Sequence, residues 1–325
     1  MGSMILDGHK DLAFRVWGAE EPRHIDLTAA EAVGFSGGFF ALSAPGPTPL
    51  ELPSIVPYER PLEPSIGRDD AVRAVLGQLD ALHTLDVHVV RAADEIADGR
   101  VNTIVHLEGA EPIAPDLSDL EEWYSRGVRS IGLVWSRSNA FGHGVPFQFP
   151  GSPDTGPGLT PAGFELVRAC NDLGILIDVS HLNETGFWDV GLASEFPIVA
   201  THSNVHALCA SPRNLKELQL RAIADSNGVV GVNFGTAYLR EDGRSEPATP
   251  IVEIVRHIEH LVELLGADHV ALGSDFEGVG VPDELGGIQG LPRLVALLAS
   301  RFDEATVAKI THGNWLRVIR ETWRT

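Results

Sequence analysis

Residues 175–181, Ile-Leu-Ile-Asp-Val-Ser-His, are a short apolar run that ends in side chains able to bind a metal ion. A helical pattern precedes this run over Thr160–Leu173, and it opens with the N-cap residue Thr160 followed by Pro161. Gly174 separates the two segments, as glycine commonly does just past the end of a helix. A helix that leads into a buried strand is the repeating unit of a parallel α/β sheet.

Similar apolar runs recur along nearly the whole chain and alternate with amphipathic stretches. The runs that we interpret as strands are Met4–Leu6, Gly38–Leu42, Thr103–Leu107, Ser130–Trp135, Ile175–Asp178, Ile198–Thr201, Val229–Asn233 and Val270–Gly273. Helical patterns between them include Asp69–Leu82, Thr160–Leu173, Pro250–Leu265 and Gly290–Phe302. About eight strands in one run favour an α/β fold closed as a (β/α)8 TIM barrel over an open sheet.

The remaining segments predict additions to a single barrel domain over residues 4–325. Two stretches that contain proline and glycine, Ala44–Pro64 and Phe147–Gly158, are interpreted as loop insertions over the barrel mouth. A C-terminal helix over Glu304–Arg320 is expected to pack across the outside of the barrel. Residues 1–3 stand ahead of Met4 and are interpreted as a remnant of an expression vector.

Composition excludes several classes of partner. The chain has 325 residues and a net charge of −21, which argues against binding to nucleic acid or to an anionic membrane surface. No apolar run reaches the roughly 18 residues that a membrane helix needs. The two cysteines, Cys170 and Cys209, do not form a disulfide framework and are expected to be free thiols. The composition therefore predicts a cytoplasmic protein without a membrane or nucleic-acid partner.

Five of the apolar runs end in His, Asp or Glu. The runs that end in this way are Ile5–Asp11, Thr103–Glu108, Ile175–His181, Ile198–His202 and Val270–Asp275. In a parallel barrel the carboxyl ends of all strands meet at one mouth, where active sites lie. Residues that are remote in the sequence are therefore expected to converge there.

The spacing of these residues predicts a metal site. His9 and Asp11 are two residues apart, so on a strand both side chains point the same way. His181 and His202 end consecutive strands and can bind a second ion, and the two oxygens of Glu108 can bridge both ions. Nitrogen and oxygen ligands without thiolate suit zinc, although manganese, iron or cobalt would also fit.

Each residue alone also has an ordinary structural interpretation. A histidine at a strand end is most often only hydrogen-bonded, and Asp275 at a strand end can simply cap the following turn. His106 shares a strand face with Glu108 and is expected to lie beside the ligands rather than among them. The metal-site prediction therefore rests on the five equivalent positions taken together.

Several motifs in a fixed order resemble the membrane (renal) dipeptidase family, peptidase family M19 of the metal-dependent amidohydrolase superfamily. The resemblance runs from Asp7-Gly8-His9-Lys10-Asp11 to Gly313-Asn314-Trp315-Leu316-Arg317 and so covers nearly the whole chain. Its specific signals are Gly158-Leu159-Thr160-Pro161-Ala162-Gly163, Leu176-Ile177-Asp178-Val179-Ser180-His181, Thr201-His202-Ser203, Ser211-Pro212-Arg213-Asn214-Leu215 and Gly273-Ser274-Asp275-Phe276.

This resemblance implies roles for seven residues. One zinc ion would be held by His9 and Asp11, a second by His181 and His202, and Glu108 would bridge them. Asp275 resembles the family's catalytic acid/base, and Arg213 resembles the group that binds the substrate carboxylate. Such an enzyme would hydrolyse dipeptides with a hydroxide that bridges the two metal ions. A homodimer is a further expectation from the family.

One departure from the family concerns the substrate. Where animal members have a histidine after the fourth strand, the stretch Gly132–Asn139 places Trp135 at or beside that position. The indole has one N–H donor and cannot become cationic, so either Trp135 donates that hydrogen bond or Arg137, Asn139 or His143 replaces it. We therefore include Trp135 and Asn139, with Arg213, among the candidate substrate-binding residues.

Three functions follow as hypotheses. The first is a zinc-dependent dipeptidase whose substrates include L-Xaa-D-Xaa dipeptides. The second is an amidohydrolase with the same site that acts on N-acyl amino acids, a lactone or a specialised biosynthetic amide. The third is a non-catalytic binding protein on a barrel scaffold, which an intact set of five ligand residues disfavours.

Overall fold

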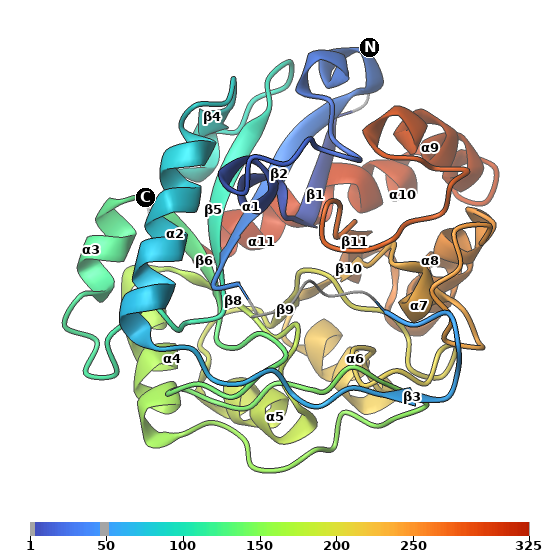
Figure 1. Cartoon of the computed structure of the whole chain (residues 1–325). Helices are drawn as coiled ribbons and strands as arrows, with labels where there is room; N and C mark the ends of the chain where they lie inside the picture. The colour runs from blue at the N-terminus through green and yellow to red at the C-terminus, as the bar shows by residue number, and fades with distance from the viewer. Residues whose placement is uncertain (1–3, 46–51, 325) are drawn as a thin grey trace.

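The chain folds into a closed ring of eight parallel strands (Figure 1). The computed structural model describes residues 4–45 and 52–324. In ring order the strands are β1 (Ile5–Lys10), β2 (Phe35–Ser43), β5 (Asn102–Glu108), β6 (Val128–Gly132), β8 (Leu176–Asp178), β9 (Val199–Ala200), β10 (Val229–Val232) and β11 (Val270–Leu272). The ring closes where the Asp11 N–H donates to the Phe276 carbonyl at 2.9 Å and the Asp275 N–H donates to the His9 carbonyl at 3.1 Å. The predicted (β/α)8 barrel is confirmed.

Helices surround the strands (Figure 1). They are α1 (Leu12–Trp17), α2 (Arg68–Leu82), α3 (Leu120–Ser125), α4 (Pro161–Leu173), α5 (Glu184–Ala193), α6 (Glu217–Asp225), α7 (Thr236–Leu239), α8 (Val252–Leu265), α9 (Leu291–Ala299), α10 (Glu304–Ala308) and α11 (Asn314–Thr322). The predicted limits of α4 hold, since the Thr160 hydroxyl accepts from the Gly163 N–H and Gly174 adopts a left-handed φ of 71°. Apolar side chains between helices and strands form the larger of two cores.

The C-terminal segment is helical as predicted, but it packs differently. α10, a π-helical turn at Lys309–Gly313 and α11 follow one another without a break, and α11 does not lie only on the outside. Trp315 of α11 packs among the barrel strands, where its indole N–H donates to the Leu272 carbonyl at 2.9 Å. A Cβ atom at Gly8 or Gly231 would lie within 3 Å of its ring. Glycines on two strands therefore leave the space that lets this helix close the barrel.

The two predicted insertions meet each other. Short strands β3 (Tyr58–Glu59) and β7 (Gln148–Phe149), one from each insertion, pair antiparallel beside the barrel. Residues 46–51 of the first insertion lie outside the described residues. A further short strand, β4 (His88–Val89), pairs with the start of β5. Within the described part of the chain, no helix is long and apolar enough to cross a membrane.

Candidate metal centre

The predicted metal ligands converge at the carboxyl ends of the strands. The Oε1 atom of Glu108 lies 3.1 Å from His181 Nε2, 3.4 Å from His9 Nε2 and 3.5 Å from His202 Nε2. His9 Nε2 is also 3.7 Å from Asp11 Oδ2. Two ligands about 2.1 Å from one ion at a tetrahedral angle are separated by roughly 3.4 Å. The spacing of these atoms is therefore that of ligands around shared metal ions.

Two overlapping groups of side chains can each hold a cation. One consists of His9, Glu108 and His202, and the other of His9, Asp11 and Asp275, with the ligand atoms of each group within 4.8 Å of one another. His9 is fully buried, and neither of its ring nitrogens has a hydrogen-bond partner among the described residues. A buried imidazole without a partner is costly unless a ligand completes it, so this residue fits a metal ion.

The backbone at the site is held in uncommon conformations. His181 and Asp275 have φ values of 67° and 60°, a left-handed region that few non-glycine residues adopt. The Asp7 carboxylate accepts hydrogen bonds from the Ser274 N–H and hydroxyl at 2.6 and 2.5 Å, which ties β1 to the turn after β11. Backbone strain of this kind is characteristic of functional sites. Here it directs two of the candidate side chains toward the same place.

Hydroxyl groups orient two of the imidazoles. His181 Nδ1 lies 2.8 Å from the Ser136 hydroxyl, and His202 Nδ1 lies 2.8 Å from the Thr201 hydroxyl. The Thr201 hydroxyl donates in turn to the carboxylate of Asp178 at 2.5 Å. Partners of this kind fix the ring orientation and leave Nε2 free to bind a metal ion. No sequence pattern marks Ser136, because its contact with His181 depends on how the loop after β6 folds.

His106 lies beside the cluster, as its place on β5 predicts. Its ring packs edge-on against His9 with centroids 5.6 Å apart, and its Nδ1 lies 2.9 Å from the Ser130 hydroxyl. Burial lowers the pKa of His106 to about 4, so this imidazole is neutral at physiological pH. A neutral, hydrogen-bonded ring supports the neighbouring ligands without adding charge.

A cavity of about 440 Å³ opens onto the cluster. Its floor includes Asp11, Glu108, His181 and Asp275. Aromatic and apolar side chains form much of the wall, and two of them, Trp135 and Phe147, have ring centroids 5.3 Å apart. The four floor residues are among the six predicted metal ligands and catalytic residues, and each follows or ends a different strand of the ring. A substrate in this cavity would therefore contact the candidate metal-ligating side chains.

The candidate substrate-binding residues are distributed unevenly around this cavity. Trp135 lines it, whereas Arg213 is buried beside it, with its guanidinium 5.8 Å from the ring centre of the lining residue Tyr238. Asn139 does not line the cavity. Its amide donates to the Leu133 carbonyl and accepts from the Phe141 N–H, so it shapes the loop. Tyr238 is a cavity residue that the sequence analysis missed.

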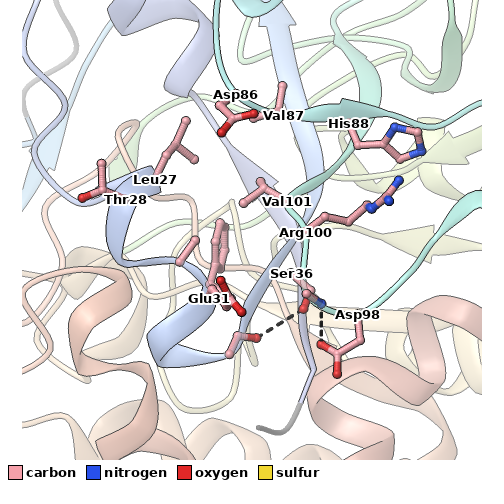
Figure 2. A pocket seen from close by; sticks show the side chains of 14 residues that line it. Leu27, Thr28, Glu31, Ser36, Asp86, Val87, His88, Asp98, Arg100 and Val101 are labelled. Atoms are coloured by element: carbon pink, nitrogen blue, oxygen red, sulfur yellow. Dashed lines mark hydrogen bonds between the residues drawn. The ribbon is translucent and has the colours of Figure 1, made fainter.

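A second cavity, of about 660 Å³, is larger but lies elsewhere (Figure 2). Its lining includes Phe35 and Ser36 at the start of β2 and His88 beside the start of β5, at the amino ends of the strands. Its acidic residues Glu31, Asp86 and Asp98 do not form a metal-binding group among the described side chains. Cavity size alone therefore does not identify the site, whereas the convergence of ligands does.

Metal binding should strengthen as pH rises and should release protons. Burial opposes the charge on His9, but the Glu108 and Asp11 carboxylates outweigh burial and raise the pKa of His9 to about 10. Burial also raises the pKa of Glu108 to about 8. Near pH 7 a cation must displace protons from this pair, so affinity should rise between pH 6 and pH 8 and weaken as pH falls.

Calorimetric titration of the metal-free protein with zinc checks this prediction. The measurement is made at pH 6, 7 and 8 in two buffers that differ in ionisation enthalpy, so that released protons are counted directly. An affinity that does not change with pH, with no proton release, would contradict the assignment of His9 and Glu108 as ligands.

Comparison with known proteins gives a consistent family. Residues 2–325 match the membrane dipeptidase family, peptidase family M19. An uncharacterized protein in the pqqA 5' region of Klebsiella pneumoniae is 51% identical over 256 residues, which cover 77% of this chain and 94% of that protein.

Two solved structures are similar over the full length. The dipeptidase AC, a metallopeptidase of family M19, is 42% identical with a TM-score of 0.94, covering 99% of each chain. A metallopeptidase from Rhodobacter sphaeroides, liganded with a phosphinate mimic of the dipeptide L-Ala-D-Ala, is 41% identical with a TM-score of 0.94. The match covers 99% of this chain and 100% of that chain. The chain therefore belongs to the membrane dipeptidase family, peptidase family M19, whose members are metal-dependent dipeptidases.

Proposed function

We propose that this protein is a zinc-dependent dipeptidase that binds two metal ions and accepts L-Xaa-D-Xaa dipeptides. The observation that carries the proposal is the position of Glu108, whose Oε1 lies 3.1–3.5 Å from the Nε2 atoms of three histidines. His9 and Asp11 would hold one ion, and His181 and His202 the other. The Rhodobacter sphaeroides relative, crystallised with an L-Ala-D-Ala mimic, supports the substrate class.

The protein's own residues supply the remaining chemistry. Zinc ions held by His9, Asp11, Glu108, His181 and His202 would polarise a carbonyl and lower the pKa of a water toward 7. Asp275 lines the cavity, and the Asn233 side-chain amide donates to its Oδ2 at 2.7 Å. The described residues make no hydrogen bond to Oδ1, so this oxygen can take a proton. In this mechanism Asp275 accepts a proton as the amide is attacked and passes it to the leaving amine.

Arg213 is proposed to hold the carboxylate of the substrate. Its Nη2 donates to the His202 carbonyl at 3.2 Å, and its Nε is buried without a partner among the described residues. Its guanidinium lies 5.8 Å from the ring centre of the cavity residue Tyr238, and its positive charge acts on Glu108 and Asp275, which line the cavity. A carboxylate bound in this way would fix the C-terminal end of a dipeptide and limit the length of substrate.

The test is a substrate panel with zinc-loaded protein. Dipeptides of L,L and L,D configuration are compared with N-acyl amino acids, in the presence and absence of a chelator. The expected result is chelator-sensitive release of free amino acids from dipeptides. Cleavage of N-acyl amino acids without any cleavage of dipeptides, at full metal occupancy, would reject the dipeptidase and select the alternative amidohydrolase.

Replacing Arg213 with lysine should raise KM more than it lowers kcat. A lysine keeps the positive charge but loses the planar pair of donors that a carboxylate prefers. We expect kcat/KM for a dipeptide to fall by about 10- to 100-fold, the value of one charged hydrogen bond. The dipeptide carboxamide, which lacks the charge, should be hydrolysed almost equally by both proteins. An equal loss on both substrates would contradict carboxylate binding.

A further inference from the structure

Arg137 is a buried cation in the wall of the cavity that the proposed mechanism does not use. It lies in the loop after β6 and is only 1% exposed, yet it lines the same cavity as Glu108 and His181. Its guanidinium carbon is 4.8 Å from the ring centre of Trp135. A charged group in this position requires an explanation, because burying it is costly.

One hydrogen bond and one ion pair hold the guanidinium of Arg137 in place. Its Nε lies 3.2 Å from Oε1 of the buried Glu111, and its Nη2 donates to the carbonyl of Ala44 at the end of β2. Nε and Nη1 are both buried and neither has a hydrogen-bond partner among the described residues, although Nε is ion-paired with Glu111. A fixed donor without an acceptor, beside a substrate cavity, is suited to an oxygen atom that the substrate brings.

The charge of the Arg137–Glu111 pair indicates which substrate oxygen would accept this hydrogen bond. Glu111 lies against Arg137 and offsets its positive charge, so the pair does not attract a second carboxylate. It can still offer a directed N–H to a carbonyl oxygen, and such a bond strengthens as negative charge develops on that oxygen. The carboxylate of the substrate is already assigned to Arg213 in the proposed function.

We propose that Arg137 donates a hydrogen bond from Nη1 to the carbonyl oxygen of the scissile amide and stabilises it as the amide is attacked. This role rests on the proposed hydrolysis of dipeptides. Trp135 then serves as the surface against which the guanidinium is oriented, and Phe147 packs against the indole with ring centroids 5.3 Å apart.

The structure disfavours the other donors in this loop. The amide of Asn139 is used within the loop, and His143 Nδ1 pairs with the Ser138 hydroxyl at 2.8 Å. Neither residue lines the cavity. Trp135 does line it, so its indole N–H is the competing donor that the experiment must separate from Arg137.

The test compares the variants R137Q, R137Q/E111Q and W135F with the wild-type protein. Because R137Q alone would leave Glu111 buried without its counter-charge, the double variant restores neutrality and keeps the fold comparable. In both Arg137 variants kcat should fall by about 10²- to 10³-fold, the usual cost of losing one donor to a developing oxyanion. KM and the zinc content per chain should remain close to wild type. W135F keeps the aromatic wall and should lose less than about 10-fold.

A phosphinate mimic of L-Ala-D-Ala gives a second readout that does not depend on turnover. Its affinity should fall in R137Q/E111Q by the same factor as kcat/KM, because it resembles the attacked amide. Wild-type kcat in the double variant, or an unchanged phosphinate affinity, would overturn the proposal. A larger loss in W135F than in R137Q/E111Q would also overturn it and assign the bond to the indole. Failure of the dipeptidase itself is distinguishable, since the wild-type protein would then cleave no dipeptide.

Discussion

Replacement of Glu108 with glutamine should abolish dipeptide hydrolysis and lower the metal content of the protein. Glu108 Oε1 lies between three imidazole nitrogens, so in the proposed function this carboxylate would offset the charge of the bound cations. Glutamine has nearly the same shape, but it removes the negative charge and brings an N–H donor toward the metal ions. We expect kcat/KM to fall by about 10³-fold or more, since each 1.4 kcal/mol of lost metal assistance is tenfold in rate.

The measurement combines steady-state kinetics with metal analysis of each purified protein. Glu121→Gln on the exposed side of α3 makes the same chemical change away from the site and should behave as wild type. Two outcomes separate the possible roles of Glu108. If the variant loses both activity and bound metal, Glu108 is a metal ligand. Full zinc content with wild-type kcat would exclude a bridging carboxylate.

The strands of the barrel could be predicted because their residues are buried on both faces. Each of the eight predicted runs overlaps a strand of the ring, since an uninterrupted apolar run is typical of a parallel strand. The limits were less accurate at β6, which was predicted to reach Trp135 but ends at Gly132. Leu133 and Val134 remain fully buried in the loop, so hydrophobicity does not mark where the strand stops.

The candidate ligands could also be predicted, because the position of a residue on a parallel strand determines which mouth it faces. Contacts between loops could not be predicted from the sequence. The pairing of Arg137 with Glu111 joins the segments that follow β6 and β5, and neither residue stands in a motif. The same holds for Trp315, whose place among the strands depends on the absence of a side chain at Gly8 and Gly231. Such features arise from complementary shapes at remote positions and leave no periodic pattern.

Replacement of Asp275 with asparagine should lower kcat by about 10²- to 10⁴-fold, the usual contribution of a positioned acid/base group. Asparagine preserves the shape of the side chain and can still interact with Asn233, but it cannot accept a proton. Burial raises the pKa of Asp275 to about 7 in the metal-free protein, and bound cations would lower it. Activity that depends on ionised Asp275 should therefore fall on the acidic side of neutrality, and this limb should disappear from the pH profile of the variant.

A second role must be separated from proton transfer, because Asp275 also belongs to a possible metal-binding group with His9 and Asp11. The exposed change Asp283→Asn serves as the matched control, and zinc content is measured in every protein. A substrate with a good leaving group, such as the ester analogue of a dipeptide, needs less protonation at the departing atom. If Asp275 transfers the proton, the variant should lose much less activity on the ester than on the amide. Equal losses on both substrates, with reduced zinc, would instead make Asp275 a metal ligand whose removal disables the site.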